Sequence, residues 1–144
     1  MFTFRLEPLI TLRDNALKER QADLAKAYEA RQILETDIKK LDQQLSEGRE
    51  SARTLMQEGQ KINVDYLLGF RRQEMFLLAN QDELKEKMAI IDEEIEVRRA
   101  AVAEANKELK IVEKLKEQRF EKYLEEQNKS EMKAMDEIAG NSRR

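Results

Sequence analysis

The feature that most constrains the fold is a seven-residue hydrophobic repeat that runs through most of the chain. Steps of alternately four and three residues from Leu6 to Leu55 reach fifteen positions, and eleven of them are apolar. These positions are Leu6, Ile10, Arg13, Leu17, Arg20, Leu24, Ala27, Arg31, Leu34, Ile38, Leu41, Leu45, Gly48, Ala52 and Leu55. A repeat of 3.5 residues is typical of a helix that packs against another helix in a left-handed coiled coil. No stretch alternates with a period of two, so we expect no strands.

A second repeat of the same kind occupies the rest of the chain. It runs from Leu67 to Val112, and eleven of its fourteen positions are apolar. The positions are Leu67, Phe70, Glu74, Leu77, Gln81, Leu84, Met88, Ile91, Ile95, Arg98, Val102, Ala105, Leu109 and Val112. The sequence therefore predicts two long helices, each with one seam of residues that faces a partner helix.

The stretch "MQEGQKINVDY", residues 56–66, interrupts the repeats and predicts a turn. Gly59 suits a helix C-terminus, and Asn63 or Asp65 can cap the next helix by accepting hydrogen bonds from its first N–H groups. The fold predicted is all-α: a long antiparallel two-helix coiled-coil hairpin with an extended C-terminal helix. The competing arrangement is a parallel homodimer, in which both helices pair with another chain, and the break at Gly59 favours the hairpin.

The predicted boundaries follow from the two seams. Helix one covers about residues 4–58, the turn 59–65, helix two 66–138 and a frayed tail 139–144, all within a single coiled-coil domain 1–144. Residue i of helix one then faces roughly residue 122 − i of helix two. An arm of fifty residues would make a rod of about 75 to 80 Å at 1.5 Å per residue. We expect Arg13, Arg20 and Arg31 to lay their stems on apolar neighbours and to hold their charged groups in water.

Composition and charge exclude several classes of protein. The chain has no cysteine and no histidine, which removes disulfides, thiol nucleophiles, common zinc sites and the usual general base. We therefore expect no enzyme activity, no metal and no cofactor. The 27 basic and 30 acidic residues are mixed along the chain, which argues against nucleic-acid binding.

The opening stretch "FRLEPLITLRD", residues 4–14, does not resemble a secretory signal, because charged residues interrupt its apolar run. No apolar run of 18 residues occurs, so no membrane insertion is expected. The stretch is instead interpreted as a helix start. Pro8 is tolerated there because the first N–H groups of a helix lack partners within it.

Apolar residues off the seam gather in two clusters. One follows the turn and consists of Tyr66, Leu67, Leu68, Phe70, Met75, Phe76, Leu77 and Leu78. The other joins the two distant chain segments at the open end: Phe2, Phe4, Leu9 and Leu12 with Ile111, Leu115, Phe120, Tyr123 and Leu124. Each cluster either packs locally or binds a partner. Beside the second lies a basic run, residues 107–122, which is either a solvated face or a site for an acidic partner.

Three stretches resemble the flagellar export protein FliJ family. They are "FTFRLEPLITLRDNALKERQADLAKA" at the start, "VEKLKEQRFEKYLEEQNKSE" late in the chain and "MDEIA" near its end. The resemblance spans nearly the whole length. It implies a two-helix antiparallel coiled coil that serves as the stalk of the type III flagellar export apparatus, without enzymatic activity of its own.

The resemblance also implies partners. They are the hexameric flagellar export ATPase, the large membrane protein of the export gate and the export chaperones. Phe4, Leu6, Arg13, Leu115 and Arg119 would face the ATPase ring. Tyr66, Phe70 and Phe76 would face the export gate. The protein would be a cytoplasmic monomer, peripheral to the inner membrane at the base of the flagellum. The rival functions are a structural coiled-coil homodimer that acts as a tether, and the equivalent stalk of a virulence type III injectisome.

Overall fold

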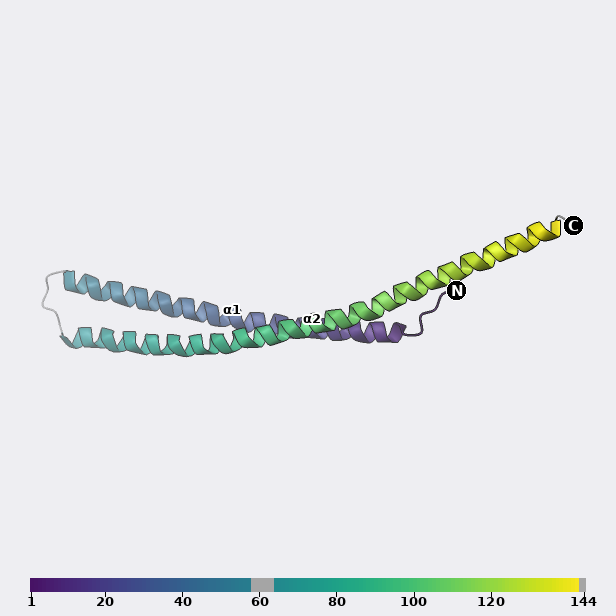
Figure 1. The fold of residues 1–144 in the computed structure, drawn as a ribbon. Coiled ribbons are helices and arrows are strands. Elements are labelled where there is room, and N and C mark those ends of the chain that lie inside the picture. The colour runs from purple at the N-terminus through teal and green to yellow at the C-terminus, as the bar shows by residue number, and fades with distance from the viewer. Residues whose placement is uncertain (58–63, 143–144) are drawn as a thin grey trace. The chain divides into compact units, whose positions relative to one another are not determined.

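The computed structural model describes residues 1–57 and 64–142 and contains two long helices within them (Figure 1). Helix α1 spans Glu7–Gln57 and helix α2 spans Val64–Ser142. They pack against each other as an all-α hairpin, with no strand in the described ranges. Ion pairs that join Arg13 to Glu108 and Arg49 to Glu74 show that the helices run antiparallel. The predicted fold class is confirmed, and the intramolecular hairpin replaces the parallel homodimer.

Helix α1 begins later than predicted, at Glu7 rather than near residue 4. Pro8 explains the difference, because it has no N–H to donate to the carbonyl of Phe4 and its ring would clash with that carbonyl in a longer helix. The chain instead enters the helix through a turn, in which the Glu7 N–H donates to the Phe4 carbonyl oxygen at 3.2 Å.

The other boundaries also differ in detail from the prediction. Val64 and Asp65, expected in the turn, already belong to α2, and α2 continues to Ser142 through the segment expected to fray. Gly59 and Asn63, the expected cap residues, lie outside the described residues.

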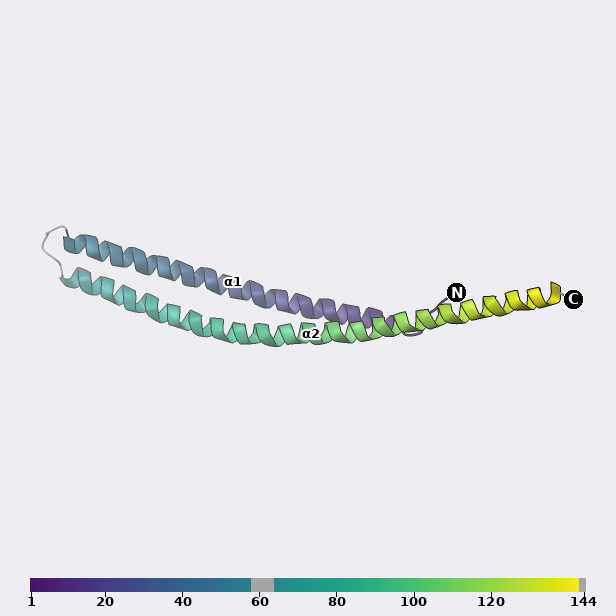
Figure 2. The same cartoon turned by 45° about the horizontal axis from the view of Figure 1, so that its top comes forward.

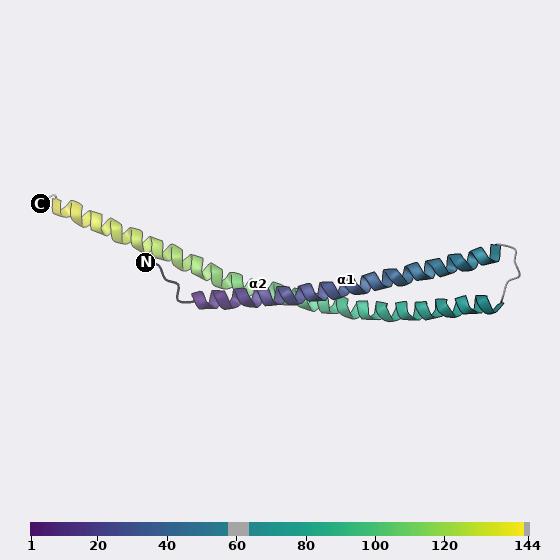
Figure 3. The same ribbon diagram turned by 180° about the vertical axis from the view of Figure 1, so that it is seen from behind.

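The chain divides into two compact units, and both helices contribute to each. The first unit combines Met1–Gln21 with Ala100–Arg144, and the second is Ala22–Arg99. Figures 2 and 3 show α1 and α2 side by side and antiparallel within the second unit.

The seam positions are the ones that the structure covers. All fourteen predicted positions of α2 are buried or half-buried. Of the fifteen predicted for helix one, Leu6 precedes α1, and only Arg20 and Leu55 are exposed. The predicted register also holds within one position, since Arg13 contacts Glu108, Arg31 contacts Asp92 and Arg49 contacts Glu74. The heptad repeat thus identified both the buried face of each helix and the alignment of the pair.

Polar seam residues do more than the sequence suggested. Arg13 and Arg31, expected to extend into water, pair with carboxylates of α2 because an acidic residue lies one position from each predicted contact. Gln81 is buried, and its side-chain N–H donates to the Asp42 carboxylate on α1. A polar pair at a seam position is satisfied in one alignment of the helices, so it favours that register over shifted ones.

Candidate partner-binding surfaces

The first candidate surface lies in the first unit, where the non-helical residues 1–6 pack on α2; we call these residues the N-terminal strap. The ring of Phe2 lies edge-on to Phe120, with centroids 5.1 Å apart, and 5.5 Å from the ring of Tyr123. Phe4 is buried, with 9% of its surface exposed. The sequence had placed these aromatic residues in one cluster, and the structure brings them together.

The five residues expected to face the ATPase fall into two groups. Phe4, Leu6 and Leu115 are buried or half-buried, and Arg13 is held by an ion pair of 2.8 Å to Glu108. Arg119 is exposed, with its guanidinium carbon 5.8 Å from the centre of the Phe4 ring. A guanidinium over an aromatic face is attracted by the ring quadrupole. Four of the five therefore pack or pair within the unit, and Arg119 is the member open to a partner.

The basic run beside this cluster is only partly neutralised. Lys116 pairs with Glu7 at 2.8 Å. Across residues 1–57 and 64–142, no ion pair engages the exposed amines of Lys107, Lys110, Lys114 and Lys122. Leu12, Ile111 and Leu124 are also exposed in this unit. The surface thus combines exposed lysines, interspersed with the exposed carboxylates of Glu113, Glu117 and Glu121, with exposed apolar side chains.

The second candidate surface lies near the start of α2, in the second unit. Tyr66 is exposed and packs edge-on against Phe70, with ring centroids 5.2 Å apart. Phe76 is exposed, and no ring contact in the described part of the chain joins it to either of them. The three residues expected to face the gate therefore form one aromatic pair and one separate ring.

A groove between α1 and α2 adjoins this aromatic pair. Phe70 and Leu77 line it from α2, opposite Leu45, Gly48 and Ala52 of α1. A Cβ added at Gly48 would meet no atom within 4 Å. The small seam residues therefore leave open space here, which the heptad pattern could not reveal because it does not record side-chain volume.

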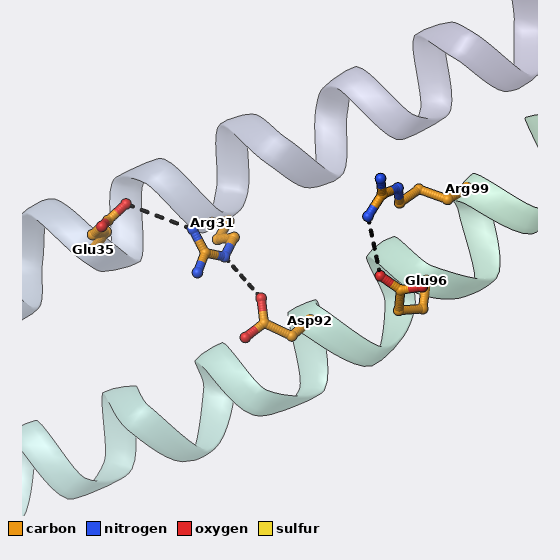
Figure 4. A network of polar contacts seen from close by, with 5 residues as sticks. All are labelled: Arg31, Glu35, Asp92, Glu96 and Arg99. Atoms are coloured by element: carbon orange, nitrogen blue, oxygen red, sulfur yellow. Dashed lines mark hydrogen bonds and ion pairs between the residues drawn. The ribbon is translucent and has the colours of Figure 1, made fainter.

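Charged residues join the helices farther along the second unit (Figure 4). The Arg31 guanidinium donates to Asp92 at 2.8 Å and lies 3.8 Å from Glu35. The hydrogen bond to Asp92 and the charge of its carboxylate raise the pKa of Arg31. On the same helix as Asp92, Arg99 pairs with Glu96 at 3.3 Å. The arginines on this side of the second unit are therefore paired with carboxylates of the same chain.

No cluster of three or more acidic side chains suited to a metal ion occurs in the described ranges. Neither α1 nor α2, as far as they are described, contains an apolar stretch that could span a bilayer.

Comparison with protein families identifies a match over nearly the whole chain. The family model described as "Flagellar FliJ protein" matches residues 1–143. None of the curated proteins and none of the solved structures matches the chain.

Proposed function

Because the chain belongs to the flagellar FliJ family, with a match over residues 1–143, we propose that it is the stalk of the flagellar export apparatus. Family membership gives the chain a role related to flagellar export. The finer proposal is that it works without catalysis, inserts into the hexameric export ATPase and links that ring to the export gate and the export chaperones. The main support for this proposal is the family match over residues 1–143 of a chain that folds as an all-α hairpin.

The first unit is the part that we propose to enter the ATPase ring. Its support is the exposed Arg119 beside the unpaired lysines Lys107, Lys110, Lys114 and Lys122. Clustered positive charge accelerates association with an acidic surface and aligns it. Phe4, Leu6, Arg13 and Leu115 contribute indirectly, by holding the strap and the two helices in place.

Tyr66, Phe70 and Phe76 are proposed to meet the large membrane protein of the gate. Exposed aromatic side chains such as Tyr66 and Phe76 are enriched at protein interfaces because they bury large areas with few rotatable bonds. The protein would therefore act at the cytoplasmic side of the flagellar base. The family match favours this assignment over the injectisome stalk and the simple tether.

The proposed mechanism needs only noncovalent contacts between the stalk and the subunits of the ring. A single hairpin inside a symmetric ring presents different side chains to chemically identical subunits. Contacts that favour one subunit conformation over another shift the population of that conformation. The stalk would thereby influence assembly of the ring and its ATP hydrolysis.

The test mixes the purified chain with its cognate export ATPase and measures binding, ring assembly and ATP hydrolysis. Arg119→Glu together with Lys122→Glu should weaken binding at least tenfold, and the loss should shrink as salt is raised. The matched control is Arg53→Glu together with Arg72→Glu, which makes the same charge change on exposed residues of the second unit. Absence of binding by the unaltered chain would refute the stalk function. Equal loss in both variants would refute the assignment to the first unit.

A further inference from the structure

The helix pair of the second unit has two sides. Charged side chains form ion pairs on one side, and apolar side chains line a groove on the other. On one side, Arg31 pairs with Asp92 and Glu35 (Figure 4). Ile33 and Ile90 each lie two positions before one of these carboxylates, which places them about 200° around their helices at 3.6 residues per turn. They belong to the other side of the helix pair, and there an apolar groove is lined by Ala30, Ile33, Leu34, Lys87, Ile90 and Ile91.

This groove exposes an unusual amount of branched apolar surface. Ile33 is 64% exposed and Ile90 66% exposed, and Val97, one heptad after Ile90, is also exposed. Isoleucine and valine have no advantage at solvated helix positions, where Ala, Glu and Lys form helix better. A contiguous apolar patch bordered by charges is typical of a surface that another protein covers.

The charges that border the groove lie one heptad from its lining residues and therefore share its face. Lys26 and Lys40 lie seven positions before and after Ile33. Asp23 and Asp37 lie seven positions before and after Ala30. No ion pair engages any of these four side chains in the described part of the chain.

These charges have a symmetric arrangement. The midpoint between Lys26 and Asp37 falls between residues 31 and 32, and so does the midpoint between Asp23 and Lys40. On α2, Lys87 lies in the groove and Glu94 one heptad beyond it, and their midpoint falls between residues 90 and 91. The ion pair of Arg31 with Asp92 places residues 31 and 32 opposite residues 92 and 91, so the charges of both helices are centred within one residue of the same level.

We infer that a second copy of this chain covers the groove, stacked face to face and antiparallel about a two-fold axis at this level. The axis brings Lys26 to the partner's Asp37 and Lys40 to the partner's Asp23. It also brings Ile33 to the small Ala30 of the partner subunit, so that a large side chain meets a small one. An isologous interface requires this kind of self-complementarity, in which the same patch supplies both halves of every pair.

The antiparallel arrangement explains the unpaired charges better than a parallel one. Parallel stacking would bring Lys26 level with the partner's residues 96 and 97, but Glu96 already pairs with Arg99 at 3.3 Å within the chain. Antiparallel stacking instead joins the four side chains that have no ion pair. Opposite charges across a rim set orientation and partner choice more than they set affinity.

Six residues line the groove, far fewer than the roughly 20 to 30 on each side of a standard protein interface, so we expect a weak dimer with a dissociation constant of roughly 10 μM to 1 mM. The chain would be monomeric when dilute and dimeric when concentrated. The dimer uses residues of the second unit and does not depend on the proposed ATPase contact, so either proposal can fail without the other.

The experiment is sedimentation velocity of the full chain over concentrations from about 5 μM to about 1 mM, the range in which an interface of this size dissociates. Lys26→Glu should raise the dissociation constant at least tenfold, because it sets two carboxylates against each other. Lys26→Glu combined with Asp37→Lys should return it to within about threefold of the original value, because each reversed charge again meets its opposite. The matched control is Lys39→Glu, an exposed residue outside the groove's heptad positions, which should leave the dissociation constant unchanged.

Each other outcome overturns the inference. A chain that is monomeric at every concentration has no such interface, and its groove would be left to a different protein. If Lys26→Glu leaves the dissociation constant of the dimer unchanged, the dimer forms through another surface. A dimer that the combined variant fails to restore is not antiparallel about this axis. Because Lys26 is exposed, circular dichroism should show unchanged helix content in all variants, which separates loss of the dimer from loss of the fold.

Discussion

The same heptad pattern runs through both compact units, yet the space between the helices is packed more completely in the first unit than in the second. In the first unit, α2 buries Ala105, Leu109 and Val112 in succession, and the N-terminal strap adds the buried Phe4. In the second unit, the seam near the turn places Gly48 and Ala52 opposite Phe70, and a groove stays open between the helices. The comparison teaches that a regular apolar period predicts which face is covered, whereas side-chain volume determines how completely it is filled.

The largest effect should come from the filled seam of the first unit. Leu109→Ala should lower the free energy of unfolding by about 2 to 4 kcal/mol, because it removes buried methyl groups and leaves a cavity between helices. Urea denaturation followed by circular dichroism measures the change.

The control for this prediction is Ile111→Ala, two positions away on the same helix, where the side chain is exposed. It should change the free energy of unfolding by no more than about 0.5 kcal/mol. Equal losses in the two variants would mean that the seam of the first unit is not its main source of stability.

A smaller loss should follow when the strap is weakened. Phe4→Ala should cost about 1 to 3 kcal/mol, because it exposes the apolar surface that the ring covers and removes the contact with Arg119. Hydrogen exchange should also become faster at the backbone amides of residues 119–123, the part of α2 that the rings of Phe2 and Phe4 contact.

Phe76→Ala is the matched control, since it deletes the same ring from an exposed position. Its unfolding free energy should stay within about 0.5 kcal/mol of the original. If Phe4→Ala were equally neutral, the strap would rest on α2 without stabilising the first unit.

The smallest effect should have the opposite sign and should come from the open groove of the second unit. Gly48→Ala should raise the free energy of unfolding by about 0.5 to 1 kcal/mol, because alanine favours the helix and its Cβ meets no atom here. Thermal unfolding detects the gain.

Gly69→Ala serves for comparison, because Gly69 is also helical and its Cβ would also enter open space. Both variants should gain stability. A loss at Gly48 alone would show that the helices need glycine there to approach each other, and the contrast between a filled and an open seam would fail.

Much of the fold could be predicted because it depends on periodicity. The seam positions followed from the spacing of apolar residues, and the antiparallel pairing and its register followed from the break in that spacing at residues 56–66. The predicted start of α1 was three residues too early, because Pro8 cannot donate to the carbonyl of Phe4 and its ring would clash with that carbonyl in a longer helix. The end of α2 was missed because local composition suggested fraying where the structure continues the helix to Ser142.

The candidate surfaces were predictable only in part. The aromatic cluster of Phe2, Phe120 and Tyr123 followed from the register, since pairing brings those distant segments together. The groove at Ile33 and Ile90 was missed, although the spacing of seven from Ile90 to the exposed Val97 could have pointed to it. Ile33 and Ile90 lie beside the seam, and the heptad positions that face the partner helix do not include them.

The sequence by itself determined that this chain forms two long helices and which stripe of each faces the other, because helix periodicity is a local property of the residue order. Only the tertiary structure decided how completely the space between the helices is packed. It also decided which charged groups form ion pairs and which remain free to bind a partner. The open space beside Gly48 and the burial of Phe4 both depend on side chains of α2. Volume and charge pairing are properties of neighbours in space, and those neighbours are distant in the chain.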